Sequence, residues 1–173
     1  MRRRPKVAVL GGTFDHLHRG HEALLRAAFR AADTIAIGLT SDAYLERHPK
    51  PYGNRMESFT TRRRNLEAYL ATTFPSREWK VVPLEDAFGG SLAPGVDVLI
   101  VSSETREGAQ RVNDERRRRR LPPLRLVVIP LVRAEDRLPL QSRRIRAGAV
   151  TADGRTRAAR RRRATSRRPT VEG

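Results

Sequence analysis

The strongest constraint on the fold is a regular alternation of short apolar runs and amphipathic segments between residues 5 and 150. The apolar runs are continuous and rich in β-branched residues, which is typical of strands buried in a parallel sheet. We expect strands over residues 6–10, 34–39, 79–84, 96–101 and 126–130. We expect helices over 20–32, 57–74, 105–120 and 143–150, with a shorter one after residue 42 and Ser142 as the cap of the last. This order predicts an α/β single domain: a doubly wound, Rossmann-like parallel five-stranded sheet with helices on both faces.

The end of the chain departs from this pattern. Residues 151–173 contain almost no apolar side chains and hold eight arginines against Asp153 and Glu172. We therefore expect a folded domain over 1–150 and a disordered, Arg-rich tail over 151–173. The alternative is a tail that makes non-specific contact with a polyanion such as RNA. Its charge supports that role, but it lacks the aromatic side chains on which bases stack.

Composition excludes several classes of protein. The chain has 36 basic and 19 acidic residues, a net charge of +17 that favours contact with polyanions, nucleotides included. It contains no cysteine, which excludes disulfides, thiolate nucleophiles and cysteine-based zinc sites. No apolar run approaches the roughly 20 residues that span a membrane, so we expect a cytoplasmic protein without membrane contact.

The richest polar segment, residues 11–21 (GGTFDHLHRGH), directly follows the first predicted strand. In doubly wound sheets, ligands bind beyond the carboxyl ends of the strands. Gly11 and Gly12 allow a tight turn and a close approach of the backbone to a ligand. Thr13 offers a hydroxyl and an amide to a phosphate, and the free amides of the helix that starts near Gly20 favour an anion. The segment therefore predicts a phosphate-binding site.

His18 and His21 are three residues apart at the start of that helix, so their rings project from the same side. A helix N-terminus disfavours the imidazolium, and we expect two neutral rings that donate hydrogen bonds. Nucleotidyl transfer needs in-line positioning and donors aimed at the charge that develops on phosphate. We therefore predict His18, His21 and Thr13 as catalytic residues.

Two other interpretations of the histidines are open. The rings could simply cap the helix and face solvent. His16, His18 and His21 could instead converge on zinc, although no cysteine or glutamate stands at a familiar zinc spacing. We predict no metal site formed by the protein itself.

Five segments carry a resemblance to a known family: residues 11–21, 38–42 (GLTSD), 101–105 (VSSET), 111–124 (RVNDERRRRRLPPL) and 138–148 (LPLQSRRIRAG). The first resembles the HxGH signature of the nucleotidyltransferase superfamily, which is shared by cytidylyltransferases, FAD synthetases and several adenylyltransferases. Together the five resemble archaeal-type phosphopantetheine adenylyltransferases. The resemblance implies transfer of AMP from ATP to 4′-phosphopantetheine, which gives dephospho-CoA and pyrophosphate, with Mg²⁺ arriving on the ATP.

Residue by residue, the resemblance implies a nucleotide site and an acceptor site. The implied nucleotide-binding residues are Gly11, Gly12, Thr13, Phe14, His18, His21, Glu104, Ser142 and Arg144. Lys50 matches a position expected to hold an anionic acceptor; the alternative is an ordinary surface lysine. Asp15 belongs to the signature without an assigned role. Arg111 and Asn113 could face the site, whereas we expect Arg116–Arg120 to form a solvated face.

The chain also departs from the family pattern. Gln141 and Arg143 replace small hydroxyl residues in the turn that grips the triphosphate, and Arg143 could reinforce that binding or crowd it. Arg120 and Arg137 stand where the pattern has glycine, and arginine fits poorly where a positive φ is required.

Three functions follow as hypotheses. The first is the adenylyltransferase of coenzyme A synthesis, with ATP and phosphopantetheine as partners. The second keeps the reaction but changes nucleotide or acceptor, as in a cytidylyltransferase for a polyol phosphate. The third is a nucleic-acid-binding module on an inactive nucleotidyltransferase fold, suggested by the charge and the altered turn.

Overall fold

The computed structural model describes residues 7–156, which form a parallel five-stranded sheet. Its strands are β1 (Val7–Gly12), β2 (Thr34–Thr40), β3 (Glu78–Leu84), β4 (Val98–Ser102) and β5 (Arg125–Ile129). They lie in the order β3-β2-β1-β4-β5, and every pairing is parallel. The chain adds β2 and β3 on one side of β1 and then returns to add β4 and β5 on the other side, so the order of strand addition reverses between β1 and β4, as in other Rossmann-like folds. The predicted fold class is confirmed.

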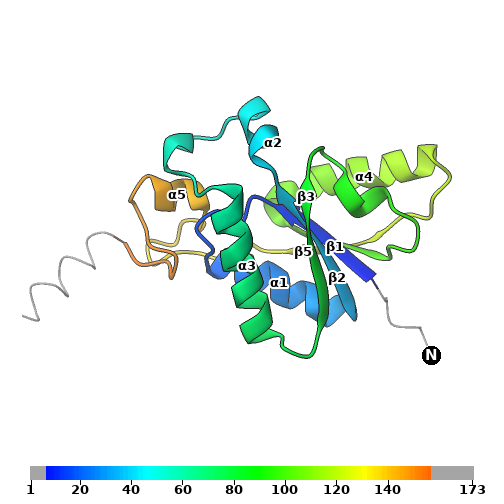
Figure 1. Ribbon diagram of the computed structural model, residues 1–173, viewed down its shortest axis with the longest axis horizontal. Coiled ribbons are helices and arrows are strands. Elements are labelled where there is room, and N and C mark those ends of the chain that lie inside the picture. The colour runs from blue at the N-terminus through cyan, green and yellow to red at the C-terminus, as the bar shows by residue number, and fades with distance from the viewer. Residues whose placement is uncertain (1–6, 157–173) are drawn as a thin grey trace, which may run out of the picture.

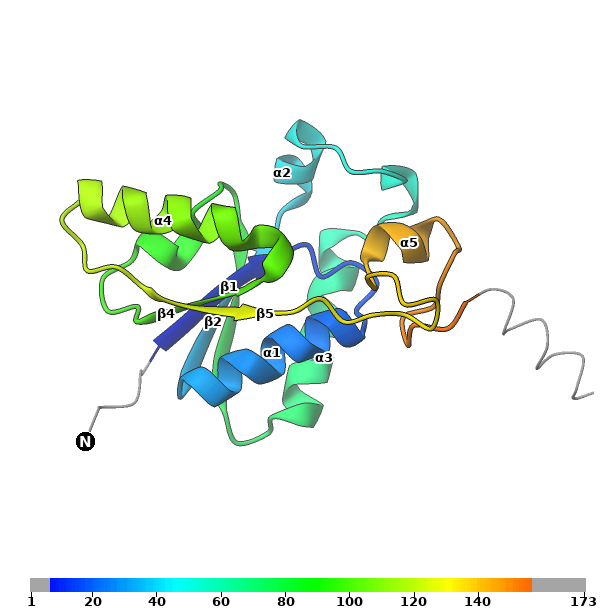
Figure 2. The same cartoon turned by 180° about the vertical axis from the view of Figure 1, so that it is seen from behind.

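Helices cover both faces of the sheet (Figures 1 and 2). The helices are α1 (Arg19–Ala31), α2 (Asp42–Arg47), α3 (Phe59–Thr73), α4 (Arg106–Arg118) and α5 (Ser142–Arg146), with 3-10 turns at Gly53–Arg55, Gly89–Leu92 and Ser103–Thr105. Helices α1 and α3 lie on one face and α4 on the other, while α5 lies near the start of α1. In the described part of the chain, no helix has the length and apolar character needed to cross a membrane.

The core divides along the pleat of the strands. Ala8 and Leu10 of β1 pack against Leu25 of α1 and Leu66 of α3 in the larger cluster. Val9, between them in sequence, faces the opposite side and packs in the cluster of α4. Because successive residues of a strand point to opposite faces, this continuously apolar strand can be buried on both sides.

The last helix differs from its expected bounds at both ends. Helix α5 ends at Arg146 rather than Val150, because Gly148 adopts φ 74° and its amide bonds back to the Ile145 carbonyl at 2.9 Å. Ser142 is its first helical residue and not its cap, and its hydroxyl donates instead to the Asp15 carbonyl at 2.8 Å.

The folded part also continues past residue 150. Val150 forms a β-bridge with Thr156, and the Arg19 amide at the start of α1 donates to the Ala152 carbonyl at 3.3 Å. Residues 151–156 therefore pack onto the domain, because their backbone satisfies polar groups of α1 and of the loop before α5. The predicted disorder of the remaining tail, 157–173, falls outside the described residues.

The arginines after the middle of α4 have different environments. We expected Arg116–Arg120 to be a solvated face, but Arg116 is buried and donates to the carbonyls of Ser91, Ala93 and Pro122. Arg120 has φ 57° and Arg137 has φ 65°, so both occupy the left-handed region. The expectation that these two positions suit glycine is confirmed.

Candidate active site

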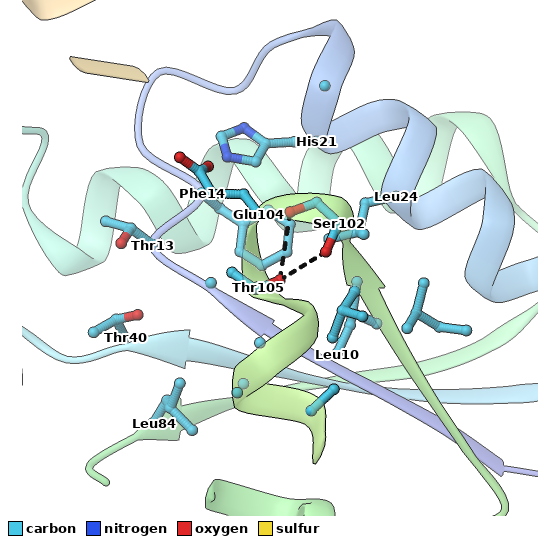
Figure 3. A pocket seen from close by; sticks show the side chains of 18 of the residues that line it. Leu10, Thr13, Phe14, His21, Leu24, Thr40, Leu84, Ser102, Glu104 and Thr105 are labelled. Carbon is cyan, nitrogen blue, oxygen red and sulfur yellow. Dashed lines mark hydrogen bonds between the residues drawn. The ribbon is translucent and has the colours of Figure 1, made fainter. Parts of the chain in front are cut away.

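A pocket of about 950 Å³ opens beyond the carboxyl ends of β1 and β4 (Figure 3). Nine of the ten predicted site residues line it: Gly11, Gly12, Thr13, Phe14, His18, His21, Lys50, Glu104 and Ser142. Figure 3 shows His21 reaching from α1 toward Phe14 and Glu104, which come from the β1 and β4 ends. The structure thus brings together residues from four separate parts of the sequence.

His18 occupies the N-cap of α1 with its hydrogen bonds fixed. Its Nδ1 accepts from the Gly20 amide at 3.1 Å, so the proton of the neutral ring lies on Nε2. Nε2 lies 3.3 Å from the Ser142 hydroxyl oxygen. At that length the contact is weak, so the Nε2–H remains able to donate to a better-placed acceptor.

His21 stacks on His18 with 3.8 Å between ring centroids and lies 5.1 Å from the Phe14 ring. Its Nδ1 is buried and has no hydrogen-bond partner among the described residues. A bare lone pair costs less there than an unpaired N–H, so the proton belongs on Nε2. With this assignment both Nε2 atoms carry their protons, and the pair presents two N–H donors from one side of α1.

Both rings are held neutral. Burial lowers the pKa of His18 to about 4, an effect partly opposed by the charge of Asp15 and reinforced by His16. Burial also lowers the pKa of His21 well below its usual value, with His18 adding to the effect. We expected the helix N-terminus to keep both rings neutral, whereas the loss of water around them is the largest cause.

Glycines shape the turn around these rings. A Cβ on Gly20 would lie 2.8 Å from Cε1 of His18, so only glycine lets the cap ring fold back over the helix start. A Cβ on Gly12 would lie 3.2 Å from the Phe14 ring, which is buried and held at φ 49°. The close packing explains why glycine stands at these two positions of the motif.

Asp15 receives a role from the structure. Its carboxylate is fully buried, accepts from the Glu57 amide at 2.8 Å and pairs with Arg146 at 2.5 Å. Arg146 also donates to the Pro51 carbonyl at 3.0 and 3.1 Å. This buried pair joins the motif loop, α5 and the loop that carries Lys50.

Arg62 makes a second buried connection that sequence reasoning missed. It donates to the backbone carbonyls of Thr13 and Thr40, at 2.9 and 2.8 Å, and to the Asp42 carboxylate at 2.7 Å. One guanidinium of α3 thereby fixes the carboxyl ends of β1 and β2. Its spacing from Phe59 and Leu66, three and four residues, put it on the buried face of α3 and was the available signal.

Of the remaining predicted residues, two line the pocket and one lies outside its lining. Lys50 is exposed at the pocket edge, and Glu104 accepts from Gln141 at 2.8 Å. Arg144 is the predicted residue placed outside the pocket lining: it pairs with Asp136 and donates to the Pro139 carbonyl at 3.0 Å. Its neighbour Arg143, which the prediction left open, lines the pocket. Residue 144 points away because successive residues of a helix differ by about 100° in direction.

His16 does not join the other two histidines. Its backbone at φ 46° turns the ring toward the Arg55 carbonyl, 3.0 Å from Nε2. Within residues 7–156, no three histidine, aspartate or glutamate side chains are arranged to hold a metal ion. The arrangement can supply donors to an anion, and a metal would need most of its ligands from elsewhere.

The two residues of α4 that could face the site, Arg111 and Asn113, have different environments. Arg111 lines the pocket. Asn113 instead holds the turn after α4, with its amide bonded to both backbone groups of Leu124 at 2.8 and 3.0 Å.

Comparison with known proteins identifies the family. Residues 9–148 match the family model described as cytidylyltransferase-like. The chain is 36% identical over 151 residues to a phosphopantetheine adenylyltransferase of Methanothermobacter thermautotrophicus, covering 87% of this chain and 88% of the relative. It is 38% identical over 142 residues to the protein of that name from Methanopyrus kandleri, covering 82% and 88%. A Methanosarcina mazei protein of the same name is 38% identical over 154 residues, covering 87% and 96%.

Solved structures agree on the fold. A protein of unknown function from Archaeoglobus fulgidus superposes with a TM-score of 0.63 at 30% identity, covering 72% of this chain and 88% of that one. Pantothenate synthetase from Thermus thermophilus superposes with a TM-score of 0.55 at 18% identity, covering 83% and 62%. The second likeness concerns the fold alone. The chain belongs to the cytidylyltransferase-like family and, within it, groups with the archaeal proteins named phosphopantetheine adenylyltransferase.

Proposed function

We propose that this protein transfers AMP from ATP to 4′-phosphopantetheine, giving dephospho-CoA and pyrophosphate. The observation that carries the assignment is the match to archaeal relatives of that name, 36–38% identical over most of both chains. The reaction class is supported independently by two neutral, stacked histidines in a pocket beyond the ends of the strands.

The reaction requires no covalent intermediate with the protein. A phosphate oxygen of the acceptor attacks the α-phosphorus of ATP, a new P–O bond forms, and the bond to the β-phosphate bridging oxygen breaks to release pyrophosphate. His18 and His21 would donate from Nε2 to the phosphate oxygens on which charge develops. The Thr13 hydroxyl and amide would add donors from the other side of the turn.

The glycine turn and Phe14 would bound the nucleotide, and Lys50 would receive the anionic acceptor at the pocket edge. Mg²⁺ would enter bound to the phosphates of ATP as part of the substrate, which is its usual mode in nucleotide sites. Ser142 would act indirectly, because its single proton is already donated to the Asp15 carbonyl.

A direct assay tests the function. Purified protein is given MgATP with phosphopantetheine, and MgCTP with glycerol phosphate, and pyrophosphate release is followed. We expect release only in the first mixture. Release with CTP and glycerol phosphate alone would transfer the assignment to a cytidylyltransferase, and release in neither would favour the inactive nucleic-acid-binding module.

We also propose that the basic segment 151–173 makes non-specific polyanion contact. The proposal is supported by the composition of this segment, which holds eight arginines and two acidic residues. The full chain should bind single-stranded RNA with an affinity that falls steeply as salt rises, and a chain ending at Thr156 should bind more weakly. Equal binding by the two chains would refute this contact.

A further inference from the structure

Three polar side chains form a hydrogen-bonded series along the pocket wall. Glu104, after β4, accepts through Oε1 from the Gln141 amide nitrogen at 2.8 Å. Gln141, in turn, accepts through Oε1 from Nε of Arg143 at 2.9 Å. All three residues line the pocket. Because both ends of the Gln141 amide are engaged, its orientation is fixed, and so is the direction of the guanidinium it holds.

The three arginines of α5 differ in what occupies them. Arg144 pairs with Asp136, and Arg146 is buried against Asp15 and the Pro51 carbonyl. Arg143 is exposed, and among the described residues its terminal nitrogens have no acceptor. It also has no carboxylate within 4.0 Å in the described part of the chain, because the neutral Gln141 amide stands between it and Glu104. Arg143 therefore offers an uncompensated charge to the pocket.

The neighbouring hydroxyl cannot serve a phosphate in the same way. Ser142 donates its one proton to the Asp15 carbonyl at 2.8 Å and lies beside Nε2 of His18. A phosphate oxygen needs a donor, and the hydroxyl has none left without breaking that bond. Among the side chains that α5 directs to the pocket, the donors available to a phosphate are thus those of the guanidinium.

We propose that Arg143 binds the polyphosphate of ATP, and that Gln141 and Glu104 are positioning residues that hold its guanidinium toward it. This inference rests on the proposed function for the identity of the nucleotide. A planar guanidinium fixed through Nε presents its two terminal nitrogens as a fork that matches two phosphate oxygens. The substitution of a small hydroxyl residue by Arg143 then replaces one kind of phosphate donor by another, and Gln141 is the change that orients it.

The first test is ATP binding by Arg143→Ala, measured by calorimetry, together with steady-state kinetics. We expect the Kd of MgATP to rise about tenfold or more, which corresponds to about 1.4 kcal/mol. The KM for phosphopantetheine should stay unchanged. Arg64→Ala is the matched control, since Arg64 is an exposed helical arginine whose loss changes net charge equally. Thermal melts of both variants establish that they are folded.

The second test separates a positioning role from a merely structural one. Gln141→Ala should weaken ATP binding several-fold in the wild-type background and have no further effect in Arg143→Ala. It should also have no effect in Arg143→Lys, because lysine retains the charge but has no Nε–H to donate to Gln141. Additive losses of ATP affinity from Gln141→Ala and Arg143→Ala would contradict the positioning role of Gln141.

The outcomes separate this inference from the function itself. If wild-type protein binds ATP and Arg143→Ala binds it equally well or better, Arg143 is no ligand or crowds the site, and the inference is wrong while the function stands. If the wild type binds ATP but does not turn over phosphopantetheine, the acceptor assignment fails and the Arg143 effect is still read from ATP binding. If the wild type does not bind ATP, both are refuted.

Discussion

At the scale of single residues, the stacked histidines carry the clearest expectation. His18→Ala or His21→Ala should lower kcat by about 10²–10³, the effect of losing one preorganised donor to a developing oxyanion. Pyrophosphate release under saturating substrates gives the measurement. His48→Ala is the control, since that ring stacks on Tyr44 outside the motif. Unchanged turnover in both motif variants would remove the pair from the mechanism.

The same burial makes stability depend on pH. The pKa of His18 is about 4 in the folded protein, against about 6.5 for an exposed imidazole. Between these values the unfolded chain binds the proton and the folded one does not, so stability is full above pH 6.5 and falls as the pH is lowered toward 4.

His18→Asn should abolish this contribution while keeping an acceptor for the Gly20 amide. Urea unfolding at pH 7 and pH 5 should show the wild type losing about 2 kcal/mol more than the variant. Equal losses would mean that His18 titrates normally in the folded protein.

Replacing Arg120 or Arg137 by glycine is expected to stabilise the folded protein. Both hold a positive φ, which costs an L side chain about 1 kcal/mol or more relative to glycine. Arg120→Gly and Arg137→Gly should each raise the free energy of unfolding by about 1 kcal/mol, measured by urea denaturation. Gln110→Gly, at an exposed position in the middle of α4, should lower it by a similar amount. A loss of stability in the first two variants would show that their side chains contribute more than their backbones cost.

At the scale of elements, α3 is joined to the ends of β1 and β2 by Arg62. Arg62→Met fills similar space but leaves the Thr13 and Thr40 carbonyls without their donor. We expect a loss of about 3 kcal/mol in unfolding free energy, since each unsatisfied buried acceptor costs about 1–3 kcal/mol. Arg63→Met, on the exposed side of the same helix, should change stability by less than about 1 kcal/mol. Equal effects would refute the special role of Arg62.

The elements themselves were largely predictable from sequence. Strands buried on both faces, such as Val7–Gly12, give unbroken apolar runs, and helix α1 shows its apolar face at helical spacing. The end of α5 was wrong by four residues, because Gly148 acts through its φ rather than through an apolar pattern. The solvated role of Arg116 was also wrong, since its acceptors are carbonyls of Ser91 and Ala93, remote in sequence.

The site was predictable in part for a related reason. Local motifs place His18 and His21 without any tertiary information, because three residues of helix fix their relation. The partners of Asp15 and the direction of Arg143 depend on segments that only the fold brings together. Arg144 was assigned to the nucleotide from a sequence pattern alone, and the structure gives it to Asp136.

At the scale of the whole molecule, residues 151–156 belong to the domain. Their contacts with Arg19, Glu135 and Val150 predict that a chain ending at Val150 melts several degrees below the full chain. A chain ending at Thr156 keeps every one of these contacts and should melt with the full chain. Differential scanning calorimetry on the three lengths compares them. Identical melting of the chain ending at Val150 would place the domain boundary where the sequence first suggested.

The buried pair of Asp15 and Arg146, 131 positions apart, has a consequence for synthesis. The ribosome makes Asp15 near the start of the chain and Arg146 much later. The Asp15 carboxylate of a nascent chain therefore has no Arg146 to pair with until α5 has been synthesised. An unpaired carboxylate is costly to bury, so we expect the motif loop to reach its final form only after α5 has been made and docks.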